Sequence, residues 1–142
     1  MATGCSSTAS VRDAVIDATR RTTNEMSLRL FLSIPFLVEA ETVENGAGGW
    51  VRRASYPELP DCRAESPMIE TALEQLERRR VECILEILRS GRLPPVPREP
   101  LADCDPEGVL VRLGFGAQVT ELLDLSGSKI CDKLKSLQAM NF

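Results

Sequence analysis

The stretch SPMIETALEQLERRRVECILEILRSG, residues 66–91, predicts a long helix and decides the fold class of the chain. Ser66 is a good N-cap, Pro67 suits the first helical position, and no further Gly or Pro occurs before Gly91. Gly91 can end the helix in the left-handed conformation, and a proline three residues later prevents its continuation. The apolar residues recur at helical spacing and are expected in the core: Ile69, Leu73, Leu76, Ile84, Ile87 and Leu88. We therefore expect a helix over 67–90.

The N-terminal segment, residues 1–40, is predicted to be helical and apolar. Ser10 can cap a short helix. The sequence MSLRLFLSIPFLV, residues 26–38, is ambiguous, because its leucines fit both strand alternation and helical spacing. Pro35 limits either element. We favour a helix up to Ser33, followed by an extended exit.

Residues 41–66 show no sustained apolar alternation. They contain a glycine-rich piece, residues 45–49, followed by several prolines, and are therefore predicted to form a flexible surface loop. The proline-rich sequence RLPPVPREP, residues 92–100, is expected to be an extended, stiff spacer. Its basic residues miss the register of an SH3 ligand, so a linker is the favoured interpretation.

Short helices are predicted over residues 105–140. Asp105 can cap the first of them, Gly114 can end it, and the last helix is expected from about Ser128. The predicted architecture is all-α: a small irregular helical domain of three to five helices, with a flexible middle loop and a proline-rich spacer.

Composition narrows the function classes. The 142 residues carry a net charge of −4 with dispersed basic groups, which argues against nucleic-acid binding. Histidine, the commonest general base and zinc ligand, is absent, so neither an enzyme nor a metal site is expected, and no cofactor. No apolar run reaches about 18 residues, so no membrane insertion is expected. The N-terminus lacks a secretory pattern, and five scattered cysteines predict reduced thiols in the cytoplasm. Cys5 and Cys62 are the candidates for a regulatory thiol.

The sequence RRASYP, residues 52–57, is a candidate phosphorylation motif. Arg52 and Arg53 precede Ser55 in the manner that basophilic kinases favour. A phosphoserine there would add nearly two negative charges. Together with Pro57, the motif is similar to the sites read by 14-3-3 proteins. The alternative is a chance match in an arginine-rich loop.

A second motif lies near the C-terminus. The sequence DPEGVLVRLGFG, residues 105–116, resembles the D-P-E-x-[IV]-L-x-x-L-G-F-G segment of the KRAP/TESPA proteins, which carry an inositol trisphosphate receptor-interacting domain. A shorter match follows at Ser128-Lys129-Ile130. The resemblance implies a cytosolic, non-enzymatic adaptor that docks on a calcium channel at the endoplasmic reticulum surface.

The candidate partner-binding residues all lie within this motif: Val109, Leu110, Leu113, Gly114, Phe115 and Gly116. A helix this short is unstable alone. Its apolar residues must therefore pack either on the last helix or on another protein. The favoured function is an adaptor or scaffold that binds a protein partner through its C-terminal helices. The alternative is a regulatory subunit or inhibitor controlled by phosphorylation of the middle loop.

Overall fold

The computed structural model describes residues 25–137, which form five helices and three strands. In chain order these are α2 (Leu28–Leu32), β1 (Glu39–Glu44), β2 (Trp50–Ser55), β3 (Arg63–Ser66), α3 (Ile69–Arg89), α4 (Pro106–Arg112), α5 (Ala117–Thr120) and α6 (Gly127–Ser136). The all-α prediction is wrong, because the fold is mixed α/β. The segment 41–66, predicted as a flexible loop, holds most of an antiparallel sheet. The helix expected after Ser10 and the residues beyond 137 lie outside the described part of the chain.

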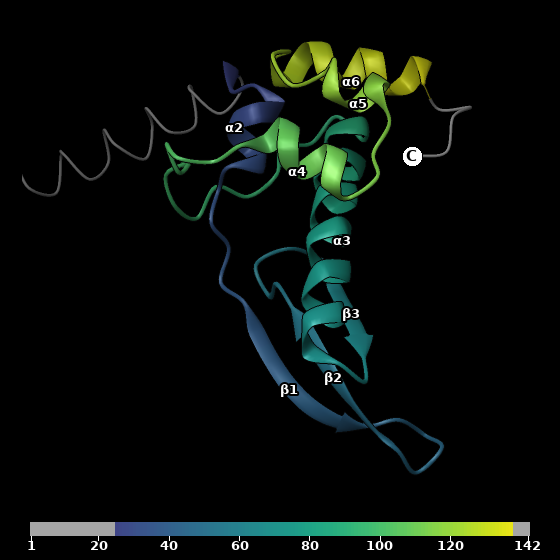
Figure 1. Ribbon diagram of the computed structural model, residues 1–142. Helices are drawn as coiled ribbons and strands as arrows, with labels where there is room; N and C mark the ends of the chain where they lie inside the picture. The colour runs from purple at the N-terminus through teal and green to yellow at the C-terminus, as the bar shows by residue number, and fades with distance from the viewer. Residues whose placement is uncertain (1–24, 138–142) are drawn as a thin grey trace, which may run out of the picture.

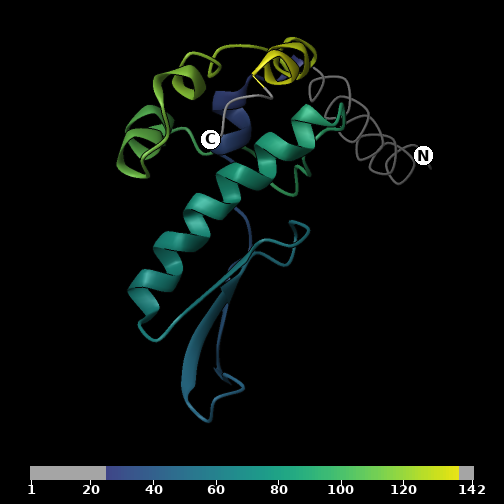
Figure 2. The same cartoon turned by 90° about the vertical axis from the view of Figure 1, so that its right-hand side faces the viewer.

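Helix α3 is the central element, and both halves of the molecule pack on it (Figure 1). Its N-terminal half covers the sheet, and its C-terminal half carries a layer made of α2, α4, α5 and α6. Two apolar clusters result, one between α3 and the sheet and one between α3 and the other helices. In the rotated view the β1–β2 hairpin extends away from the body of the protein (Figure 2).

The sheet is a meander in the order β1-β2-β3, with both pairs antiparallel. Asn45 builds the hairpin loop, since its side-chain oxygen accepts hydrogen bonds from the N–H groups of Ala47 and Gly49. Across the strands, the Arg53 guanidinium lies 2.7 Å from the Glu65 carboxylate and 3.4 Å from that of Glu41. Opposite charges on neighbouring strands, rather than apolar alternation, thus mark the outer face of this sheet.

The long helix predicted over 67–90 is confirmed as α3, although its start differs in detail. Met68 is the N-cap residue, and the Ser66 hydroxyl oxygen accepts a hydrogen bond from the Met68 N–H at 3.3 Å. The predicted apolar face is partly wrong: Leu76 is fully buried, but Leu73 is 39% exposed. The helix buries two sides, because Ala72, Leu76 and Cys83 pack toward the sheet while other residues of its C-terminal half pack on the helical layer: Val81, Ile84, Leu85 and Leu88.

The helix favoured up to Ser33 is also confirmed, as α2. It is held to the distant α5–α6 connection by main-chain bonds, including one from the Arg29 N–H to the Leu123 carbonyl at 2.8 Å. The Asp105 cap of α4 is confirmed as well, since its carboxylate accepts from the Gly108 N–H at 3.2 Å. These short helices are stable through such tertiary contacts rather than through their own length.

The proline-rich segment 92–100 contains neither helix nor strand, but it is held against the domain. Arg98 pairs with Glu58 at 2.7 Å, and the Leu101 N–H donates to the Ser33 carbonyl at 2.8 Å. Val96 packs against the helical core. The segment is therefore a strap that joins the sheet end to the helical layer, not a free spacer.

Acidification should loosen this strap. The Arg98 guanidinium and the Leu37 N–H hold the pKa of Glu58 below its ordinary value. A carboxylate with a depressed pKa contributes stability above its unfolded pKa, and that contribution disappears as the pH falls through the folded pKa. We expect Glu58→Gln to lower the thermal midpoint at pH 7, and the difference from the parent to shrink as the pH falls below the ordinary pKa of a glutamate, about 4.3. Melting curves across this range test it; a constant difference would contradict the proposed role of the ion pair.

Candidate interaction surface

The C-terminal motif residues come together in the structure, but mostly as core. Leu110 and Leu113 are buried, Phe115 is 6% exposed, and Val109 packs on the same helical cluster. Gly114 adopts a φ of +83°, which ends the helix as predicted, and Gly116 precedes α5. These apolar residues therefore pack inside the protein and not on another protein. Val111, which is 70% exposed, is the large apolar residue that the motif leaves outside.

Three consecutive arginines of α3 connect this motif to the rest of the fold. Arg78 stacks on the Phe115 ring, 4.7 Å from its centroid, and donates a hydrogen bond to the Leu113 carbonyl. Arg79 pairs with two glutamates of its own helix. Arg80 is buried and donates to the Leu32 carbonyl at 2.9 Å. Arg78 and Arg79 share the Glu82 carboxylate, whereas Arg80 pairs with Glu77, so the three guanidinium groups are already paired and do not form one anion site.

A cavity of about 250 Å³ lies between α2, α3 and α4, and Glu77 and Arg80 line it. Their side chains pair at 3.0 Å, and the Tyr56 hydroxyl also hydrogen bonds to Glu77. Burial and this hydrogen bond raise the pKa of Tyr56. Glu77 and Arg80 are therefore paired with each other, and Asp105, which also lines the cavity, caps α4. Within residues 25–137, no cluster of three side chains suited to holding a metal ion occurs.

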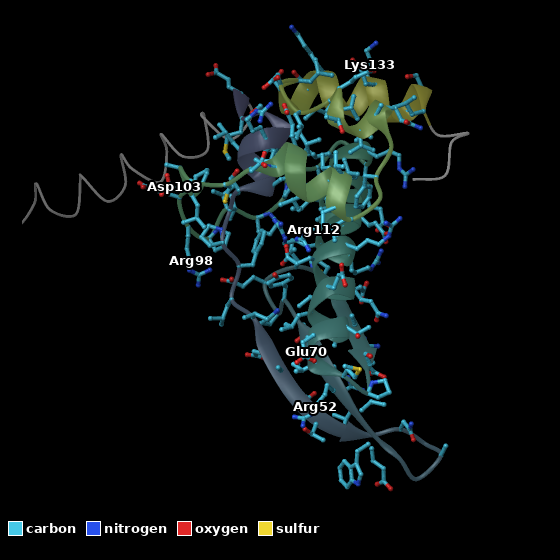
Figure 3. The ribbon with its side chains drawn as sticks, in the orientation of Figure 1. Arg52, Glu70, Arg98, Asp103, Arg112 and Lys133 are labelled. Atoms are coloured by element: carbon cyan, nitrogen blue, oxygen red, sulfur yellow. The ribbon has the colours of Figure 1, made fainter. Side chains whose placement is uncertain are left out.

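Ser55 lies at the end of β2, the central strand, between Glu39 of β1 and Arg63 of β3. Its neighbour Arg53 is engaged by two glutamates, while Arg52 is exposed on the hairpin (Figure 3). Pro57 follows in the exposed turn after the strand. A kinase or a 14-3-3 protein reads an extended, accessible segment, so β2 would first have to leave the sheet. The phosphorylation hypothesis requires a flexible loop, but the structure places Arg52, Arg53 and Ser55 in strand β2.

The outer edge of β1 is open, and its hydrogen-bonding pattern can be derived. The Asn45 N–H donates to the Gly49 carbonyl at 2.8 Å, which marks a hydrogen-bonded pair. Such pairs alternate with non-hydrogen-bonded pairs along an antiparallel ladder. Three residues consequently direct their backbone groups away from β2: Ala40, Thr42 and Glu44. Apart from the ladder, no backbone hydrogen bond within residues 25–137 involves these three residues.

The surroundings of this edge are acidic on one face and partly apolar on the other. On the outer face, a hollow of about 310 Å³ lies beside Glu39, Ala40, Glu41 and Ser55. On the inner face, α3 packs on β2 and β3 and leaves the hairpin end uncovered. Exposed apolar side chains remain there and in the adjoining segments, among them Trp50, which is 66% exposed, and Val38. Figure 3 shows Arg52 on the hairpin below the first turn of α3, which carries Glu70.

Our sequence analysis missed this surface, although a signal was present. The Asn45-Gly46 dipeptide is a strong hairpin marker, and it lies between segments containing β-branched residues at 42–43 and 51. The exposed strands lack the apolar alternation that a half-buried strand shows. From sequence alone, the glycine-rich loop therefore indicates flexibility.

Comparison with known proteins adds no relative. No family model, curated protein or solved structure matches the chain. None of the helices within residues 25–137 combines the length and apolar character required to cross a bilayer.

Proposed function

We propose that this protein is a non-enzymatic adaptor that binds a basic, extended peptide segment of a partner protein along β1. The open edge of β1 is the observation that supports this proposal. An extended peptide can add to such an edge through main-chain hydrogen bonds, with side chains on alternate faces supplying specificity. The outward N–H and carbonyl groups of Ala40, Thr42 and Glu44 would form the new ladder.

The charge of the edge selects the partner. β1 carries three glutamates within six residues. Glu39 and Glu41 share the outer face, where the hollow beside them can accept a lysine or arginine side chain. A second β1 strand would instead bring glutamates close to glutamates, which is unfavourable. The acidic edge thus disfavours self-pairing and favours a basic partner.

Trp50 supplies an anchor on the other face. Its register partner is Glu44, so its side chain lies on the same face as Thr42 and Ala40. Exposed aromatic residues are common anchors in protein interfaces. A bound strand with small or β-branched side chains on this face would cover part of Trp50.

The proposed role is the adaptor role that the sequence predicts, but the partner binds along β1 and not at the C-terminal motif. The resemblance to the KRAP/TESPA segment implied docking through residues 109–116, but Leu110, Leu113 and Phe115 are engaged in the core. If the partner is a calcium channel at the endoplasmic reticulum surface, the proposal requires it to present a basic extended segment. The described cysteines are free thiols, which supports placing the adaptor in the cytoplasm.

The binding test can use the protein's single tryptophan. We expect a synthetic peptide of about eight residues, lysine alternating with valine or threonine, to shift Trp50 emission saturably. Thr42→Pro should weaken this binding more than about tenfold. It removes an N–H that the sheet does not use, and proline is tolerated on strand edges. Thr42→Ala keeps the N–H and serves as the matched control.

Two outcomes would contradict the proposal. The first is equal binding of a peptide in which glutamate replaces every lysine. The second is undiminished binding by Thr42→Pro. Circular dichroism and thermal melts of both variants must show that the sheet remains folded. Weakening of the interaction at high salt is also expected, because the surface glutamates are exposed to solvent.

A further inference from the structure

Two cysteines from different elements meet in the packing between α3 and the sheet. Cys62 lies directly before β3, and Cys83 lies in the middle of α3. Both are buried in the same apolar cluster, at 3% exposure each. The Cys83 Sγ atom also lies 3.8 Å from the Pro60 carbonyl oxygen.

The turn before β3 holds this arrangement in place. Asp61 adopts a φ of +56°, a left-handed conformation that is uncommon for a residue with a side chain. The Tyr56 N–H closes the turn by donating to the Cys62 carbonyl at 2.9 Å. Cys62 is thus fixed over the face of α3 that carries Cys83, so the thiol pair is a consequence of the fold.

Cys83, although buried, borders a cavity of about 160 Å³ that opens to solvent. Pro60 and Ile87 form apolar parts of its wall, and the charged lining consists of two guanidinium groups and two carboxylates: Arg79, Arg92, Asp61 and Glu86. A small oxidant can therefore approach this sulfur from the cavity. The neighbouring Cys62 thiol and the positive charge of Arg79 lower the pKa of the Cys83 thiol. The neighbouring Cys83 thiol and burial raise the pKa of the Cys62 thiol.

We propose that Cys62 and Cys83 form a hydroperoxide-responsive thiol pair, in which Cys83 is oxidised first and Cys62 then closes a disulfide. In the first step the Cys83 sulfur attacks one peroxide oxygen, the O–O bond breaks, and water or an alcohol leaves. This gives a sulfenic acid at Cys83. In the second step the Cys62 sulfur attacks that sulfur, the S–O bond breaks, and water leaves. The hydroperoxide is reduced by two electrons, and the two thiols are oxidised to one disulfide.

The bond would join the turn before β3 to the centre of α3, across the sheet–helix cluster. A cross-link of this kind restricts the unfolded chain and so favours the folded state. We expect the oxidised protein to melt about 10 °C above the reduced one. Oxidation of the thiol pair is independent of peptide binding at β1, because Cys62 and Cys83 lie between α3 and the sheet and not at the outer edge of β1.

Tryptic mapping of the full chain tests the pair directly. Cleavage after arginine releases Cys62 in residues 54–63 and Cys83 in residues 81–89, and each fragment contains one cysteine. After treatment with dilute hydrogen peroxide and alkylation, we expect these two fragments to be linked. Reduction should separate them. Exposed Cys104, in residues 99–112, is the internal reference for general thiol oxidation.

The order of the steps has its own test. In Cys62→Ser, a dimedone adduct is expected at Cys83, because no thiol remains to resolve the sulfenic acid. In Cys83→Ser, Cys62 should react with dimedone no faster than Cys104. Absence of the linked fragments in the parent protein, under conditions that oxidise Cys104, would overturn the proposal without reliance on any variant. An adduct that forms first at Cys62 would overturn the assigned order.

Discussion

Leu76→Asp is expected to remove a large part of the stability of the protein at 25 °C. Leu76 is 0% exposed and lies in the cluster that joins α3 to the sheet. The substitution removes a buried leucine and leaves a carboxylate without a partner in apolar surroundings. We expect a loss of at least about 4 kcal/mol in the free energy of unfolding, which is a large part of the about 5–15 kcal/mol typical of a domain. Circular dichroism at 222 nm and chemical denaturation measure the loss.

Leu73→Asp is the matched control on the same helix. Leu73 is 39% exposed, so a carboxylate there can remain hydrated. We expect a change below about 1 kcal/mol. From sequence alone both leucines belong to the core stripe, and both substitutions would be equally damaging. Similar losses in the two variants would show that the helix is rotated relative to the structure described here.

Phe115→Ala is expected to destabilise the helical layer by about 3–5 kcal/mol. The ring is buried against the helical cluster and lies under the Arg78 guanidinium. Its removal leaves a cavity and takes away the stacking surface that links the α4–α5 connection to α3. The size of the stability loss distinguishes a core residue from a docking residue, because truncation of an exposed docking residue would leave stability almost unchanged.

Val111→Ala provides the comparison within the same motif. Val111 is 70% exposed, and its truncation should change the free energy of unfolding by less than about 0.5 kcal/mol. Denaturant titrations of Phe115→Ala and Val111→Ala measure the two changes in the free energy of unfolding. If Phe115→Ala is as stable as the parent and loses binding to a partner, the motif is a docking site and the core assignment is incorrect.

The two proposals can fail separately. Peptide binding depends on the backbone groups of β1 and on the glutamates beside them, whereas thiol oxidation depends on contacts between α3 and the turn before β3. Thr42→Pro should therefore leave the peroxide response intact. Likewise, Cys83→Ser should leave binding of the basic peptide intact. A variant that removes both properties would indicate a general loss of structure.

The helices could be predicted because their signals are local. Asp105 caps α4 with its own side chain, and Gly114 ends it with a positive φ that other residues rarely adopt. The 21 residues of α3 contain neither glycine nor proline, and glycine follows one residue after its C-cap. In α2, Ser27 and Pro35 limit a short apolar segment. In each case, neighbouring residues determine the backbone conformation.

The sheet, the phase of α3 and the fate of the C-terminal motif were decided by tertiary packing. The strand β1 has almost no buried side chain, so the period of two that reveals a strand is absent from it. Leu73 and Leu76 are equally apolar, and only the positions of the sheet and the helical layer around α3 make one exposed and the other buried. The residues around Phe115 could pack inside or outside, and the arginine at position 78 helps to hold them inside. Sequence pattern reports which residues prefer burial, but the partner surfaces that bury them come from elements distant along the chain.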